Sequence, residues 1–478
     1  MTVEASGSES RVRRALSLSL VNTAIGKVSG LLVGIALARI LVPEEFGVFA
    51  VALVALNGIL SFNELGVSLA IVRWRGNPQE IVSTVTTISM LSSALLYVGC
   101  WFGAPSFAVL MGAPDATGVV RLLCLSVLVD GMTAAAAQLV NRDFRQGTRL
   151  AVDTTNLVIT TGVTVGLALG GHGAWSLAWG QLVGNLLSAL LLFRLVSRWP
   201  RPGFDYRHAV SLLAFGMPLA GASVVVFAML NIDYLVIGWQ LDAAALGLYL
   251  LAFNLSSWPV STFSTVVRRV SLAAFSEVRD HRVRRQDVFV RMAVMLALPS
   301  LPACALLSAL ALPTITTLYG QKWAAAAAAL QFLAVFGLVR VFSELAYDFL
   351  IALGEARRCL SLQVLWLLGL AVALPVGARI GGIEGVAMGQ ALVALVLVLP
   401  LFLASVARIG IGLGRLGQAL LRPVVGCLAL VAAVAVVRWL TEPSLVQLLV
   451  GGVAGAAVYL PVVWPLRHIF RTPSEVGS

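Results

Sequence analysis

Charged side chains inside long apolar segments are the residues of this sequence most able to do chemistry. An ionisable group at the middle of a bilayer costs roughly 2.5–3.5 kcal/mol to insert, so each one needs a partner or a function. Lys27 and Arg340 are the only basic residues well inside such segments. A buried cation can offset the desolvation of an anionic group. We therefore expect Lys27 and Arg340 to bind an anionic substrate.

Four carboxylates accompany these two cations. Glu344 and Asp348 follow Arg340 by one and two helical turns, which places all three on one broad face of a helix. Glu64 and Asp130 lie in two earlier segments. We expect these acids to couple an ion or to form ion pairs, and a structural pair between Arg340 and Glu344 is the alternative to a substrate site.

Asn231 and Asp233 are further candidates for binding substrate. Residues two apart on a helix point about 200° from each other, so the two side chains cannot share one narrow face. We expect one of them to face packing.

The sequence gives no reason to expect a cofactor or a metal. The five cysteines form no CxxC pair, which argues against a metal site or a disulfide framework. No GxxxxGK[ST] loop for a nucleotide is present.

The elements that hold these residues are apolar segments along most of the chain. Hydrophobic residues make up 59% of the sequence and charged residues only 12%, about half the share of a soluble domain. A membrane helix needs about 20 apolar residues. The sequence predicts an all-α polytopic membrane protein with fourteen transmembrane helices, the first of them retained. The predicted spans are 15–38, 46–71, 81–103, 117–140, 152–170, 174–196, 209–239, 245–267, 288–312, 325–352, 359–378, 383–406, 420–440 and 445–466.

The positions of the arginines predict the orientation of these spans. Every second loop is rich in arginine, whereas the intervening loops hold few basic residues, such as Lys322. The arginine-rich loops include those with Arg73 and Arg75, with Arg142, Arg145 and Arg149, and with Arg357 and Arg358. Cytoplasmic loops carry the excess of Lys and Arg. We therefore expect both termini in the cytoplasm. The net charge of +11 follows from these loops, so no nucleic-acid partner is expected.

Three pairs of short segments indicate an internal repeat. Residues 41–49 align with 241–249, residues 177–182 with 386–391, and residues 110–112 with 318–320. Each pair falls at the same span of its half. The sequence predicts two six-helix lobes related by a parallel repeat, residues 1–200 and 201–415, followed by two C-terminal helices in 416–478.

Several of these segments resemble a known family. Leu37–Val54, Phe62–Trp74, Phe204–Ala220, Asn231–Pro259 and Leu318–Trp323 resemble the O-antigen and exopolysaccharide flippases of the polysaccharide transporter family. That family is part of the multidrug/oligosaccharidyl-lipid/polysaccharide (MOP) exporter superfamily. The resemblance implies that a polyprenyl-diphosphate-linked oligosaccharide moves from the inner to the outer leaflet of the bacterial plasma membrane by alternating access. It also implies membrane lipids as partners, with a polysaccharide polymerase and glycosyltransferases acting on the same substrate.

Other functions remain open at this point. A lipid II flippase or a cation-coupled drug antiporter of the same superfamily is the main alternative. A membrane glycosyltransferase or polymerase is less favoured, because the loops expected outside the membrane are short and hold few acids or bases. No enzymatic activity is therefore expected.

Overall fold

The computed structural model describes residues 25–63, 67–74, 76–143, 145–196, 201–277 and 282–466, and most of them are helical. The chain divides into two compact units, Met1–Gly247 and Leu248–Ser478. The domain boundaries predicted from the repeat stay predictions.

Helices of the first unit begin with the helical residues 25–40. They continue with α2 (Pro43–Asn63), α3 (Ala70–Arg73), α4 (Gln79–Leu110), α5 (Ala116–Cys124), α6 (Ser126–Arg142), α7 (Gln146–Leu169), α8 (Ala174–Leu195) and α9 (Tyr206–Gln240). The first five residues of α10 (Ala243–Glu277) belong to this unit and the rest of the helix to the second.

The second unit contains α11 (Arg282–Ala309), α12 (Ala311–Leu318), η1 (Gln321–Trp323), α13 (Ala326–Ala352), α14 (Ala356–Val393), η2 (Ala394–Val398), α15 (Leu399–Arg408), α16 (Leu413–Leu440) and α17 (Leu445–Val463). Its core includes Val294 and Leu298 of α11, Leu430 of α16 and Tyr459 of α17. The Tyr459 hydroxyl donates to the Leu298 carbonyl at 2.8 Å, which satisfies this phenol inside the apolar core.

Twelve helical segments of the described residues are long and apolar enough to cross a membrane. Their apolar side chains point outward as well as inward: Phe102 is 76% exposed and Val372 71%. Only lipid can solvate such surfaces, because helices satisfy their own backbone groups and leave the side chains to meet hydrocarbon. The prediction of an all-helical membrane protein is confirmed.

One of the twelve segments, Ala356–Arg408, is 53 residues long and turns back on itself. The backbone leaves helical geometry at Gly381 and Gly382, and a Cβ at Gly377 or Gly385 would collide with the backbone of the other. Residues eight apart in a continuous helix are about 12 Å apart along its axis. The contact therefore shows two antiparallel arms, which correspond to the predicted spans 359–378 and 383–406.

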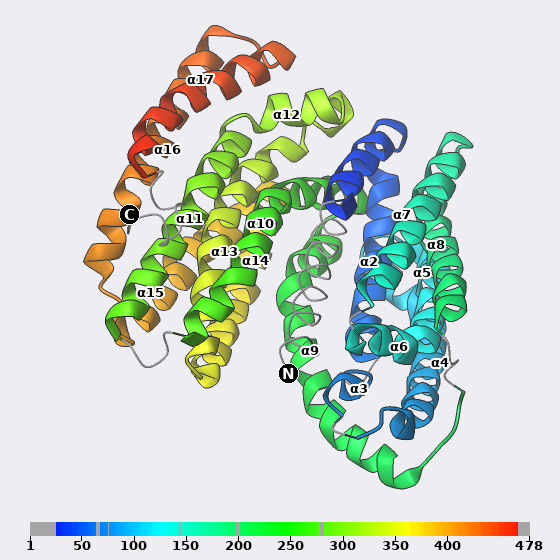
Figure 1. The fold of residues 1–478 in the computed structure, drawn as a ribbon. Helices are drawn as coiled ribbons and strands as arrows, with labels where there is room; N and C mark the ends of the chain where they lie inside the picture. The colour runs from blue at the N-terminus through cyan, green and yellow to red at the C-terminus, as the bar shows by residue number, and fades with distance from the viewer. Residues whose placement is uncertain are drawn as a thin grey trace. The chain divides into compact units, whose positions relative to one another are not determined.

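Helices α7 and α8 form a similar antiparallel pair in the first unit, where they lie side by side (Figure 1). Gly173 precedes α8 with φ 53° and ψ −134°, and Gly382 has φ 55° and ψ −136°. Only glycine adopts this region without strain. The two turns thus share one unusual conformation, at positions that the predicted repeat places in equivalent hairpins.

Within the predicted span 46–71, α2 is described as far as Asn63, and residues 67–69 form turns. Val67 and the short helix α3 enter a core with α4, α6 and α9. Val67 and Ile71 are fully buried there against Val85 and Leu212. This packing places the end of α3 beside the first turns of α4 and α9.

Candidate functional site

Arg340 lies near the middle of α13, a helix of 27 mostly apolar residues. Its Nε donates to Oε1 of Glu344 at 3.0 Å, and both side chains are about a quarter exposed. The pair that the sequence offered as an alternative is therefore present. Arg340 has five N–H donors, and this contact uses one of them. The arrangement can hold the guanidinium in place while its terminal nitrogens remain available for an anion.

Asp348 follows one turn later and is 2% exposed. The structure therefore places a guanidinium and two carboxylates along one stretch of α13, as the spacing predicts. Whether these groups bind substrate or couple an ion stays a prediction.

The other predicted residues lie in the first unit. Asn231 and Asp233 on α9 are 7% and 1% exposed. The Asn231 amide donates to the Phe227 carbonyl at 3.0 Å, and Asp233 Oδ1 accepts from the Tyr234 backbone N–H at 2.9 Å. Both polar groups thus make hydrogen bonds within α9, and their roles in binding stay predictions.

Lys27 and Asp130 are half-buried, Lys27 in the helical residues 25–40 and Asp130 in α6. Glu64 lies outside the described residues. The structure leaves the roles predicted for these three residues as predictions.

A cavity of about 500 Å³ lies where α3, α4 and α9 meet, and the sequence analysis did not anticipate it. Arg73 and Trp74 line it from the end of α3, and Glu80 from the first turn of α4. Ser211 and Phe215 line it from α9. This volume is within the roughly 300–1,000 Å³ of small-molecule sites. The cavity therefore offers a cation, a carboxylate, a hydroxyl and two aromatic rings to one ligand.

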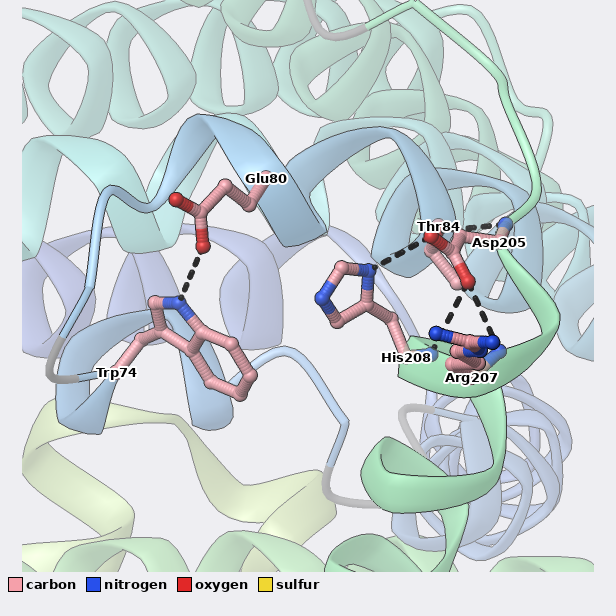
Figure 2. A network of polar contacts seen from close by, with 6 residues as sticks. All are labelled: Trp74, Glu80, Thr84, Asp205, Arg207 and His208. Carbon is pink, nitrogen blue, oxygen red and sulfur yellow. Dashed lines mark hydrogen bonds and ion pairs between the residues drawn. The ribbon is translucent and has the colours of Figure 1, made fainter.

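Contacts on both sides fix the Trp74 ring in this cavity. Its Nε1 donates to Glu80 Oε2 at 3.4 Å, and its ring meets the His208 ring edge-on at 5.8 Å between centroids. In Figure 2 the indole points toward Glu80, with His208 nearby at the start of α9. The Arg142 guanidinium donates to the Ile71 and Gly76 carbonyls, which lie on either side of Trp74 in the chain.

The segment that leads into α9 is fastened to α4. The Asp205 N–H donates to Thr84 Oγ1 at 3.2 Å, and Gly203 exchanges hydrogen bonds with Thr87. Asp205 then caps α9 by accepting from the backbone N–H groups of Arg207 and His208 (Figure 2). These bonds hold the pKa of the Asp205 carboxyl below its ordinary value, with a smaller contribution from the His208 ring at 3.2 Å.

Sequence reasoning treated Arg73 as a marker of orientation and gave Trp74 no role. The available signals were the Arg-Trp pair itself and Asp205 ahead of an apolar run, which is a typical helix N-cap. Neither signal shows that the two segments, more than a hundred residues apart, meet at one cavity.

Comparisons with known proteins agree with the fold and the resemblance. The family described as "Polysaccharide biosynthesis protein" matches residues 36–328. The succinoglycan biosynthesis transport protein ExoT of Rhizobium meliloti is 30% identical over 63% of this chain and 60% of its own length. The lipopolysaccharide biosynthesis protein WzxC of Escherichia coli is 23% identical over 75% of this chain and 74% of its own.

The match to ExoT, like that to the teichuronic acid biosynthesis protein TuaB of Bacillus subtilis, spans about 60% of the relative's length. Among solved structures, the lipid II flippase MurJ matches with a TM-score of 0.78 at 14% identity, covering 94% of this chain and 99% of that one. A MATE family multidrug transporter of the MOP superfamily matches with a TM-score of 0.63 at 16% identity, covering 83% and 98%. This multi-pass membrane protein has the fold of the MOP superfamily and belongs to the polysaccharide biosynthesis protein family.

Proposed function

We propose that this protein is a flippase that moves polyprenyl-diphosphate-linked oligosaccharides from the inner to the outer leaflet of the bacterial plasma membrane. Membership of a polysaccharide biosynthesis family supports the pathway, and the transport function named for ExoT supports the role. The lipid II flippase MurJ shares the fold, which is compatible with a flippase on this scaffold.

The observation that carries the proposal is Arg340 inside an apolar span, held by Glu344 at 3.0 Å. A diphosphate cannot enter hydrocarbon without compensation for its lost hydration. An arginine offers it charge-assisted and bidentate hydrogen bonds. Lys27 would add a second cation, and Asn231 and Asp233 would meet hydroxyl groups. Glu64, Asp130 and Asp348 would couple an ion or balance charge.

The full topology belongs to the same proposal. The helical residues 25–40 would complete a first span, and the turn at Gly381–Gly382 would divide Ala356–Arg408 into two. The twelve candidate segments then become fourteen helices with both termini in the cytoplasm. Spans 1–6 and 7–12 would form the two lobes of an alternating-access transporter, with two helices appended.

The partners follow from the substrate. Glycosyltransferases would complete the lipid-linked unit on the cytoplasmic side, and a polymerase would use it on the other side. The protein itself would break no covalent bond, and its relatives carry names of transport and biosynthesis proteins.

A genetic experiment tests this function. The chain is expressed in a strain that lacks its own exporter of this class but makes the lipid-linked unit. Restored surface polysaccharide is the expected result. Unchanged intracellular accumulation of the lipid-linked unit, with the protein present in the membrane, would contradict the proposal.

A further inference from the structure

We propose that the cavity between α3, α4 and α9 is a loading site that binds the sugar-diphosphate headgroup of the lipid-linked substrate before translocation. The inference rests on the proposed function and adds to it a second binding site, separate from the charged residues of α13.

The charge in this cavity suits a phosphate. Arg73 is exposed at the end of α3, and no hydrogen bond or ion pair engages its guanidinium within the part of the chain that the structure describes. A guanidinium without a carboxylate partner can give its full set of donors to a phosphate. Glu80, the acid of the same cavity, is engaged with Trp74 instead.

The aromatic and polar groups suit a sugar. A sugar ring has an apolar face of C–H groups that packs on an aromatic ring, and hydroxyls at its edge that need donors and acceptors. Trp74 and Phe215 supply the rings, Ser211 supplies a hydroxyl, and Glu80 has a second carboxylate oxygen. A few polar groups among apolar walls are the usual composition of a specific small-molecule site.

Hydrogen bonds position the groups that line the cavity. Arg142 donates to the Ile71 and Gly76 carbonyls on either side of Trp74, while Thr84 and Thr87 make hydrogen bonds to the segment that leads into α9. A Cβ at Gly76 would lie 3.0 Å from Trp74 Nε1 and 3.2 Å from Glu80 Oε2, so a larger residue would have to displace these two groups by a few tenths of an ångström. Such preorganisation lowers the entropic cost of binding.

The position fits the start of a transport cycle. Arg73 falls in a loop expected on the cytoplasmic side, where lipid-linked sugars are assembled. A headgroup bound here would be held near the membrane surface while its prenyl chain stays in lipid.

The test measures binding to the full-length protein in phosphatidylcholine nanodiscs. The probes are farnesyl diphosphate and farnesyl-diphosphate-linked glucose, galactose and N-acetylglucosamine. We expect Arg73→Ala to raise the Kd of all four probes at least tenfold, because the loss of one hydrogen bond to a charged group has about this effect on affinity. Trp74→Leu should remove the extra affinity of the glycosylated probes and leave farnesyl diphosphate unchanged. Arg357→Ala, an exposed arginine outside the cavity, is the matched control.

A second measurement uses the wild-type protein, because Trp74 also packs against the core. Diazirine versions of the glycosylated probes should cross-link to peptides that contain residues 70–80 and 206–215. Wild-type affinity in Arg73→Ala and Trp74→Leu, or cross-links only elsewhere, would overturn the loading site and leave the flippase proposal intact. Equal displacement of the probes by phosphatidylglycerol would make the cavity a phospholipid site and also overturn it. A wild-type protein that binds none of the probes would contradict the proposed function itself.

Discussion

In α13 the Arg340 guanidinium donates to the Glu344 carboxylate across 3.0 Å, one helical turn apart and within a span. A carboxylate so close lowers the cost of keeping the cation in the membrane. The same contact leaves the terminal nitrogens of Arg340 for a ligand. Arg340 can therefore both pair with Glu344 and bind a ligand. Variants can show whether it does the second.

Replacing Arg340 by alanine should lower glycan export at least tenfold, because a charge-assisted hydrogen bond to the diphosphate is lost. Arg340→Lys should keep part of the activity, since it retains the charge but not the bidentate geometry. Surface glycan per unit of membrane-inserted protein is the measurement. Export equal to wild type in Arg340→Ala, at normal protein levels, would show that the pair is structural only.

A side chain at Gly382 should destabilise the protein. With φ at 55° and ψ at −136°, alanine would be strained by roughly 1–3 kcal/mol. We expect Gly382→Ala to lower the Tm of the detergent-solubilised protein, measured by intrinsic fluorescence.

Gly381 is the matched control, because its φ of −141° is ordinary and no heavy atom lies within 4 Å of an added Cβ. Gly173→Ala should behave like Gly382→Ala if the two hairpins are equivalent. Equal Tm values for Gly381→Ala and Gly382→Ala would contradict this account of the turn.

The cap of α9 should weaken in acid. The folded-state pKa of Asp205 is below its ordinary value near 3.8, so its contribution is present above pH 3.8 and is lost as pH falls through the lower folded value. Hydrogen exchange at the Arg207 and His208 amides measures this loss. Asp205→Asn keeps a neutral acceptor, so in this variant the protection of the Arg207 and His208 amides should not change over the same pH range. A pH-independent wild type would refute the cap as described.

The orientation can be checked with single cysteines in a background without the native five. Arg357→Cys should react with a membrane-impermeant maleimide only after permeabilisation, since its loop is expected in the cytoplasm. Lys322→Cys should react in intact cells. Both positions are exposed in the structure, so accessibility depends on the side of the membrane. The reverse pattern would invert the topology.

Much of the fold follows from the sequence, because apolar segments of sufficient length must be helical in lipid. The Arg340–Glu344 pair could also be predicted, because side chains one turn apart on a helix lie next to each other. The similarity around Gly180 and Gly389 indicated the repeat, and the matching turns at Gly173 and Gly382 agree with it.

The cavity beside Trp74 could not be predicted in this way. It depends on α3 packing into a core with α4, α6 and α9, and on Asp205 meeting Thr84, a contact between segments far apart in the chain. A single sequence shows the local cap but not the surface against which it packs. Arg73 was therefore understood only as a charge near the membrane.

The most direct test of the central claim is a flipping assay with purified protein in proteoliposomes. A polyprenyl-diphosphate glycan with a dithionite-sensitive fluorophore on the sugar is placed in both leaflets. In vesicles that contain the wild-type protein, dithionite added outside should bleach the fluorophore of both leaflets. In vesicles that contain Arg340→Ala, the inner-leaflet fraction should stay fluorescent. Wild-type vesicles that bleach only as far as protein-free vesicles, under an imposed ion gradient and membrane potential, would contradict the assignment as a flippase.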